Sequence, residues 1–297
     1  MRNSFVRVLK LLFTPLAFAF LLWFAWQSRA ELAELIGNAS LVHLGLAAIV
    51  WALLHALSPV LAVVIFAACG SQVSWRQAFA THAARLPARY LPGGVWHTVG
   101  RVMDYREQGV ATRHLSTFVL LENGLAAAVT LAIGGAIVFS MRGADTVGVI
   151  AAAAGLAGIV ALPLMTYAIN TRVLQRPDRM STAAMLKSVA VSGAFWLGAT
   201  VAFLLYLNAF PASTGDYSLF EMAGIYLFSW GVGFVAIFAP QGIGVFEVVA
   251  SELMDGPIGL MGLAALIAGF RVVVLVADVA VWLLYQATRK SSPTTSA

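Results

Sequence analysis

Charged residues are scarce in this sequence. They make up 10% of its 297 residues, whereas 61% are hydrophobic and the mean hydropathy is +0.88. Soluble domains carry roughly 25% charged residues and roughly 45–50% apolar ones. The balance therefore excludes an ordinary soluble domain and predicts an all-α polytopic membrane protein.

Cysteine is nearly absent as well. Cys69 is the only one, so an intrachain disulfide is excluded, and its apolar surroundings favour a small core residue. The five histidines show neither H-E-x-x-H nor another paired-ligand spacing, so we expect no metal site and no cofactor. The net charge of +5 is compatible with nucleic-acid binding, but the basic residues flank apolar segments. Membrane topology explains them better, and no nucleic-acid partner is expected.

Two breaks organise the chain. Proline and glycine combine in L-P-G-G at 91–94 and again in A-P-Q-G-I-G at 239–244. Proline donates no backbone hydrogen bond and glycine adds backbone freedom, so a helix must end at each place. Inside a bilayer such a break is tolerated only where protein or a water-filled cavity surrounds it. Pro92 and Pro240 lie 240 − 92 = 148 residues apart, which is about half of the chain.

Long apolar segments are expected to cross the membrane at 11–26, 41–69, 115–139, 147–170, 189–210 and 258–286. The mixed stretch 70–113 predicts two short helices that meet at the first break, and 219–254 predicts a second such pair. The first ten residues carry three basic side chains, which fits a cytoplasmic anchor and, as an alternative, a signal peptide. A connection is expected at 29–38, a basic loop at 171–187 and a flexible tail at 291–297.

The spacing of the breaks predicts two inverted repeats, at about 1–145 and 146–290, within one flippase-like transmembrane domain covering 1–297. Each repeat would hold three transmembrane helices and one re-entrant or fully crossing hairpin, giving about 6–8 membrane segments. In this topology 15 of the 18 basic residues lie on the cytoplasmic side, with both termini, which satisfies the positive-inside rule.

A helix that starts at each break would present unpaired N–H groups and the positive end of its dipole, which suits a phosphate. The alternative is that both motifs are only turns for helix packing. The residues expected to bind a lipid headgroup or its phosphate are Arg85, Arg89, Pro92, Gly93, Gly94, Trp96, His97, Arg101, Pro240, Gln241, Gly242, Gly244 and Arg271.

Ionisable side chains within the apolar segments are costly and so are functional candidates. The candidates for a buried ionic or coupling role are Glu122, Asn123, Glu247 and Asp278. We expect Glu122 to pair with Arg271 across the pseudo-twofold axis, either as a structural pair or as one that opens to accept a phosphate. Glu247 is expected either to bind a cation or proton, or to cap backbone donors. His97 is expected to be a satisfied interface histidine or a hydrogen-bonding partner near the first break.

Three stretches together resemble one family: R-Y-L-P-G-G-V-W-H-T-V-G-R-V at 89–102 followed by E-Q-G-V, Glu122 in the next span, and A-P-Q-G-I-G-V-F-E at 239–247. They are similar to the flippase-like transmembrane region of lysylphosphatidylglycerol synthases and of stand-alone proteins like it. The residues that match the family patterns are Tyr90, Pro92, Gly93, Trp96, Gly100, Arg101, Pro240, Gly242, Gly244 and Glu247. The family's lysine after Pro-Gly is Gly94 here, which removes a basic contact.

The resemblance implies an inward-facing lipid cavity with re-entrant helices, in a bacterial inner membrane. It implies that an anionic phospholipid or lipid-linked molecule moves between leaflets, without an aminoacyl-transfer domain. Three alternatives stay open: a carrier of polyprenyl-phosphate-linked sugars, a scaffold for a lipid- or glycan-synthesis enzyme, and an intramembrane lipid phosphatase. The last lacks a Ser-Arg-Ser run or an acidic pair at the break, so we expect no enzyme.

Overall fold

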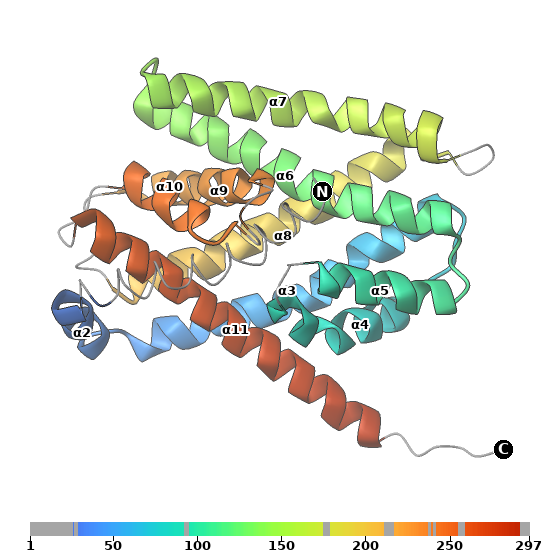
Figure 1. Ribbon diagram of the computed structural model, residues 1–297, viewed down its shortest axis with the longest axis horizontal. Coiled ribbons are helices and arrows are strands. Elements are labelled where there is room, and N and C mark those ends of the chain that lie inside the picture. The colour runs from blue at the N-terminus through green and yellow to red at the C-terminus, as the bar shows by residue number, and fades with distance from the viewer. Residues whose placement is uncertain are drawn as a thin grey trace, which may run out of the picture.

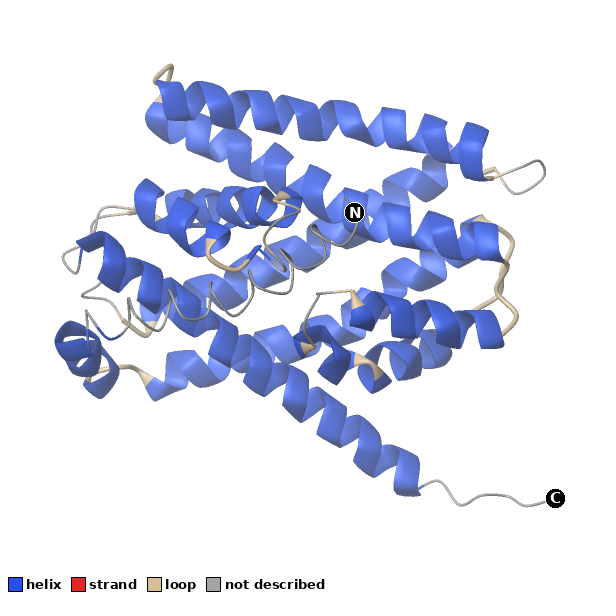
Figure 2. Cartoon of the chain, in the orientation of Figure 1, coloured by secondary structure: helices blue, strands red, loops and turns tan. Residues whose placement is uncertain are grey.

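The computed structural model describes residue 26, residues 29–91, 95–174, 179–210 and 217–236, residue 239, and residues 242–254 and 259–291. Within these ranges the chain is helical apart from turns, and no strand occurs (Figure 2). The all-α prediction is therefore confirmed for the described part of the chain.

Five described helices are long and apolar enough to cross a membrane, so the chain is a multi-pass membrane protein. They are α3 (Leu41–Ala68), α6 (Thr112–Arg142), α7 (Thr146–Ala168), α8 (Thr182–Asn208) and α11 (Gly259–Ser291). A π-helical turn, η2 (Ile169–Val173), continues α7. The predicted span at 11–26 lies outside the described residues except for Trp26.

Shorter helices lie between the long ones, and a pair of them flanks each predicted break. The first pair is α4 (Trp75–Ala84) and α5 (Trp96–Glu107), joined through the 3₁₀ helix η1 (Leu86–Tyr90). The second is α9 (Leu219–Val235) and α10 (Val245–Leu253). The prediction of two short helices within 70–113 is thus confirmed. We call α4, η1 and α5 the first hairpin, and α9 and α10 the second hairpin.

Three predicted boundaries were wrong. The connection expected at 29–38 contains a helix, α2 (Arg29–Gly37), and the basic loop expected at 171–187 ends earlier because α8 begins at Thr182. Helix α11 continues to Ser291, the first residue of the predicted tail, whereas 292–297 lie outside the described residues. Helix α8 starts early because the Ser181 hydroxyl accepts a hydrogen bond from Ala184 N–H, which caps the helix before its apolar run begins.

Helix α6 is the centre of the tightest packing, with α7 along its outer side and α9 against another face (Figure 1). Glycines allow these close approaches. A Cβ on Gly135 would lie 2.3 Å from the carbonyl oxygen of Ala151 on α7, and one on Gly134 would lie 2.2 Å from the backbone nitrogen of Phe228 on α9. Small residues at helix crossings are the usual means of membrane helix association, because backbones then approach closely.

Each hairpin is packed against its long helices through aromatic side chains. In the first half Phe66 of α3, Tyr105 of α5 and Phe118 of α6 meet at ring distances of 4.8–5.7 Å. In the second half the buried rings come from α8, α9, α10 and α11, and they are Phe203, Tyr226, Phe246 and Phe270. These two centres hold the hairpins in place and so position the polar groups between them.

Helix α11 crosses the face of the molecule opposite α7 (Figure 1) and packs against α3, α4, η1 and α10. It therefore contacts elements of both hairpins. Helix α3 in turn packs along α8, which joins the two halves near their middle.

Candidate functional site

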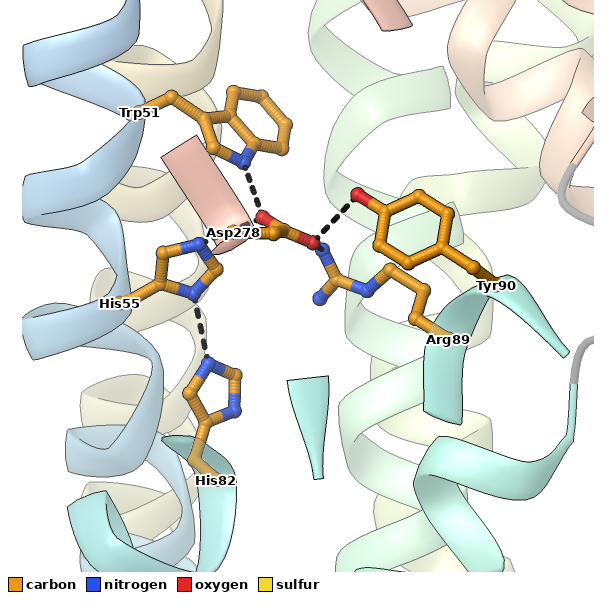
Figure 3. Close-up of polar contacts among 6 residues, drawn as sticks. All are labelled: Trp51, His55, His82, Arg89, Tyr90 and Asp278. Carbon is orange, nitrogen blue, oxygen red and sulfur yellow. Dashed lines mark hydrogen bonds and ion pairs between the residues drawn. The ribbon is translucent and has the colours of Figure 1, made fainter. Parts of the chain in front are cut away.

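One buried acidic group at these helix contacts is Asp278 of α11, which is 1% exposed. One carboxylate oxygen, Oδ1, accepts hydrogen bonds from Trp51 Nε1 at 3.3 Å and from His55 Nε2 at 2.8 Å. The other, Oδ2, accepts from Arg89 Nη1 and from the Tyr90 hydroxyl, both at 2.9 Å. Figure 3 shows the carboxylate between the α3 residues on one side and the η1 residues on the other.

A second histidine extends this arrangement. His82 of α4 lies with its Nε2 2.9 Å from Nδ1 of His55 (Figure 3). His97 of α5 packs edge-on against His82, with the ring centroids 5.4 Å apart. All three imidazoles are buried. We call Trp51, His55, His82, Arg89, Tyr90 and Asp278 the Asp278 cluster.

Two of the buried imidazole nitrogens have no hydrogen-bond partner among the described residues: Nδ1 of His82 and Nε2 of His97. An unpaired buried polar atom costs about 1–3 kcal/mol. The prediction that His97 is a satisfied interface histidine is therefore not supported for its Nε2 atom within the described part of the chain.

Local sequence explains how the cluster is assembled. Ser74 caps α4 in a capping box with Gln77, and the Trp75 indole donates to the Ala56 carbonyl of α3 at 3.0 Å, which fixes α4 against α3. Pro87, in the first turn of η1, then redirects the chain. The 3₁₀ turn brings Arg89 and Tyr90 onto α11.

An ion pair links α5 to α6. Arg101 Nη1 and Nη2 donate to the two oxygens of Glu122 at 2.8 and 2.5 Å, in the bidentate geometry that makes Arg–carboxylate pairs strong. The Arg101 side chain is 5% exposed and that of Glu122 is 21% exposed. The guanidinium also lies over the Phe118 ring, 5.3 Å from its centroid.

A second ion pair links α10 to α11. Arg271 Nε donates to Glu247 Oε1 at 2.5 Å, and the other oxygen of Glu247 accepts from the Gly244 N–H at 2.7 Å. The Glu247 side chain is fully buried, whereas Arg271 is 29% exposed. Of the two roles predicted for Glu247, capping of backbone donors is confirmed.

The prediction that Glu122 pairs with Arg271 was wrong. Glu122 accepts from Arg101, and Arg271 donates to Glu247. The reason is that each hairpin returns beside its own following helix, α5 against α6 and α10 against α11. Each hairpin therefore supplies the oppositely charged partner of the mid-helix residue on the helix that follows it.

The other predicted site residues take simpler roles. Arg85 forms an exposed ion pair with Asp104, and a Cβ on Gly100 would lie 2.9 Å from the Arg85 side chain, so glycine lets these groups approach. Asn123 donates to the Val119 carbonyl on its own helix at 2.7 Å. Trp96 is half exposed at the start of α5. Gly242 has a φ of +66°, which favours glycine, and lies against the Gly233 backbone.

Pro92, Gly93, Gly94, Pro240 and Gln241 lie outside the described residues. The helices that follow them are described, and their N-termini differ. Glu247 caps α10 with its carboxylate, whereas no side chain of the described residues caps the N-terminus of α5. A carboxylate already complements the dipole of α10, so the end of α5 is better suited to an external anion.

Sequence reasoning missed the histidine and tryptophan members of the cluster: Trp51, His55 and His82. The available signal was position rather than spacing, because His55 lies within the apolar segment 41–69, where a polar ring needs a partner. Testing the histidines only for metal-ligand spacing passed over this. Among the described residues no group of three or more His, Cys, Asp or Glu side chains has a geometry that would hold a metal ion.

Compared with known proteins, the chain matches no model of a protein family and no curated protein.

Proposed function

We propose that this chain is a lipid transporter of the bacterial inner membrane, a stand-alone protein similar to the flippase-like region of lysylphosphatidylglycerol synthases. It would move a lipid with an anionic, phosphate-bearing headgroup between the leaflets. The observation that carries the proposal is a pair of charge-reversed ion pairs, Arg101–Glu122 and Glu247–Arg271, at matching places in the two halves of the chain.

The match is close when the first half is shifted by the distance between the two breaks. Arg101 falls at 101 + 148 = 249, two residues from Glu247, and Glu122 falls at 122 + 148 = 270, one residue from Arg271. Helix α5 shifts to 244–255, against 245–253 for α10, and α6 shifts to 260–290, against 259–291 for α11. Interrupted segments at corresponding positions of two halves are the usual marker of a transporter's binding site.

Helix packing supports the same repeat. Helix α6 packs against α8 and α9, and α11 packs against α3 and α4. Exchanging each helix of the first half for its counterpart in the second turns one set of contacts into the other, as a pseudo-twofold axis requires. The distribution of basic residues favours opposite orientations for the two halves, with both termini in the cytoplasm.

The ion pairs are better suited to exchange than to simple stabilisation. A buried salt bridge gains little over apolar packing, because desolvation of the charges offsets their attraction. In each pair one partner is buried and the partner on the long helix is 21% or 29% exposed, for Glu122 and Arg271 respectively. In the second pair the exposed member is the cation, so Arg271 can meet an anionic headgroup while Glu247 stays anchored. In the first pair Glu122 is the exposed member, and it has to turn aside before a phosphate can reach Arg101. A lipid phosphate can thus replace a carboxylate as the partner of an arginine.

The first hairpin is the better phosphate site of the two. Its arginines include those at 85, 89 and 101, and the N-terminus of α5 is not capped by a described side chain. At the second hairpin the Glu247 carboxylate already takes that place. We therefore propose that a headgroup first binds beside α5 and then passes toward Arg271.

The test is reconstitution of the full chain in liposomes of phosphatidylcholine that contain a trace of fluorescent phosphatidylglycerol, phosphatidylcholine or a polyprenyl phosphate. Translocation is read from the fraction of label that an impermeant reductant can reach. The informative variant is the double neutral change Arg101→Gln with Glu122→Gln, because it leaves no buried charge unpaired. We expect phosphatidylglycerol movement to fall roughly 10- to 150-fold, as the loss of one charge-assisted contact of about 1.5–3 kcal/mol implies.

Arg142→Gln is the matched control, since Arg142 forms an exposed pair with Asp145 at the turn between α6 and α7. It should translocate as the wild type does. Equal rates for the wild type and the double neutral variant would reject the assigned site. Absence of translocation of every labelled lipid by the wild type would reject the transport function itself.

A further inference from the structure

We propose that His82, His55 and Asp278 form a proton relay that neutralises Asp278 and so loosens its hold on Arg89. The inference rests on the proposed function, because its consequence is a change in the first hairpin, where the lipid phosphate would bind. It adds to that function a source of coupling, the proton, and a route for it.

The relay is continuous in geometry. His82 Nε2 lies 2.9 Å from His55 Nδ1, and His55 Nε2 lies 2.8 Å from Asp278 Oδ1. Both are hydrogen-bonding distances. The three groups come from three different helices, α4, α3 and α11, and each is 3% exposed or less. A proton can therefore pass between buried groups from the first hairpin to α11 without entering the lipid.

The carboxylate sets the tautomers of both histidines. An ionised carboxylate only accepts hydrogen bonds, so His55 must carry its proton on Nε2 and accept at Nδ1. His82 must then carry its proton on Nε2, which leaves Nδ1 of His82 as the basic end of the chain. That atom is buried and has no partner among the described residues.

Transfer follows as three linked shifts that balance. A proton binds Nδ1 of His82, the Nε2 proton of His82 moves to Nδ1 of His55, and the Nε2 proton of His55 moves to Oδ1 of Asp278. One proton enters and one carboxylic acid forms, and both imidazoles end neutral with their tautomers exchanged. No buried imidazolium remains in either end state, which avoids the cost of an unpaired buried charge.

Charged and titratable groups surround both ends of the relay. Asp278 is faced from α3 by Trp51 and His55 and from η1 by Arg89 and Tyr90. On α11 itself Arg271 lies two helical turns before Asp278, and it donates a hydrogen bond to Glu247 of α10. The charged and titratable groups that act on His82 are His55, Arg89, Arg101 and, through its ring contact, His97. Of the other charged groups on the first hairpin, Asp104 is bound to Arg85.

A purely structural role explains less of the arrangement. Arg89, Tyr90 and Trp51 already supply three donors to the carboxylate. His55 adds a fourth, and His82 satisfies only His55, while its own Nδ1 is left without a described partner. An unpaired buried nitrogen costs free energy, and a role in proton transfer gives that cost a reason.

The consequence lies at Arg89. Its side chain is 27% exposed, and Asp278 Oδ2 is the carboxylate oxygen that accepts from its Nη1. Once Asp278 is neutral, its charge no longer attracts Arg89, so the guanidinium is held less firmly and can turn toward an anionic headgroup. Binding of a phosphate by Arg89 is thereby linked to the uptake of one proton.

The test uses the full chain in liposomes of phosphatidylcholine with a trace of fluorescent phosphatidylglycerol and a pH-sensitive dye inside. We expect an imposed pH gradient to accelerate lipid translocation by the wild type and to be accompanied by proton entry. His55→Gln and His82→Gln should both lose the acceleration and the proton entry. His43→Gln is the matched control on the same helix, since His43 bonds Ser40 outside the cluster, and it should respond as the wild type does.

A spectroscopic readout separates the relay from the transport function. Infrared difference spectra after a drop in pH should show a carboxylic-acid C=O stretch that is absent in Asp278→Asn and appears more slowly in His55→Gln. This measurement needs no lipid movement, so it decides the relay even if the wild type translocates nothing. A full gradient response in His55→Gln, or a stretch that appears at the wild-type rate in that variant, would overturn the relay and leave lipid transport standing.

Discussion

The two hairpins differ in how their charges are satisfied. The second hairpin is satisfied by its own immediate neighbours, because Glu247 both caps α10 and binds Arg271 of the next helix. The first hairpin reaches further: Arg101 binds the next helix, whereas Arg89 binds Asp278, 189 positions away in the sequence. The carboxylate of the second hairpin thus pairs with groups next to it in the chain. The first hairpin also forms an ion pair with the second half of the molecule.

Helix α11 joins the two arrangements. Arg271 holds the second hairpin and Asp278 holds the first, and the two residues are two helical turns apart on one face. A change in charge at Asp278 therefore alters the first hairpin while the second stays anchored. Under the proposed function, this asymmetry would give the molecule a moving part and a fixed part.

The comparison predicts its largest effect at Glu247. Glu247→Ala leaves Arg271 without its carboxylate and the Gly244 N–H without its cap, so we expect a loss of about 3–5 kcal/mol in the free energy of unfolding. The measurement is denaturant unfolding in detergent micelles. The double change Glu247→Gln with Arg271→Gln should recover most of the loss. If Glu122→Ala destabilises the protein more than Glu247→Ala, then the second hairpin is not the more tightly held one.

A comparable but more local effect is expected at Asp278. Asp278→Ala removes the common acceptor of Trp51, His55, Arg89 and Tyr90, so the loss should be about 3–5 kcal/mol. Hydrogen exchange in lipid nanodiscs should speed up in η1 and α4, and the amides of α10 should keep their wild-type rates. Equal acceleration in both hairpins would show that α11 does not hold them independently.

Reversing one ion pair sharpens the comparison further. Arg101→Glu combined with Glu122→Arg gives the first hairpin the polarity of the second. The fold should be kept, since each single change costs stability and the pair restores a coupling energy of about 0.5–3 kcal/mol in a double-mutant cycle. Translocation of phosphatidylglycerol should nevertheless fall about tenfold, because the buried arginine has left α5. A wild-type translocation rate would mean that polarity of the pair is irrelevant to transport.

The smallest expected effect is on the pH dependence of stability, and it concerns Asp145, which lies in neither hairpin. Asp145 caps α7 outside the membrane-spanning helices, and its hydrogen bond from the Gly148 N–H, with Arg142 nearby, holds the pKa of its carboxyl below the ordinary value. A lowered folded-state pKa stabilises the protein above the unfolded-state pKa of about 3.9, and this is lost as pH falls through the folded-state value. Thermal unfolding followed between neutral pH and the acid limit should lose this small acid-dependent part in Asp145→Asn, whose amide still caps the helix. An unchanged pH profile would contradict this account.

The helices could be predicted from the sequence because their causes are local. Apolar runs of sufficient length define α3, α6, α7, α8 and α11, and a proline with glycines separates the short helices of each hairpin. Glu247 was identifiable as a cap because it lies three residues after Gly244, the spacing of a capping box. The boundaries that failed, at α2, α8 and the end of α11, lie where polar residues can continue a helix.

The site could be predicted only in part. Glu122, Arg271 and Asp278 stood out because charges inside apolar segments are rare, and Arg101 and Glu247 stood out because each follows one of the two breaks. Their partners did not, because pairing depends on which helices are neighbours. Glu122 was assigned to Arg271 on symmetry alone, whereas α5 brings Arg101 to it first. Trp51 and His55 lie in the apolar segment 41–69 and His82 in the mixed stretch 70–113, and no spacing in the sequence marks them as partners of a residue on α11.

Taken by itself, the sequence determined that this is an all-helical multi-pass membrane protein with two proline–glycine interruptions half a chain apart, since hydropathy and backbone chemistry act over a few neighbouring residues. Only the tertiary structure decided which charge meets which. The low dielectric constant between packed helices makes an unpaired charge costly, so the nearest opposite charge is taken, and nearness is set by helix packing rather than by sequence distance. The two hairpins differ for this reason. Glu247 of the second hairpin pairs with Arg271 on the helix that follows it, whereas Arg89 of the first hairpin pairs with Asp278 on the last helix.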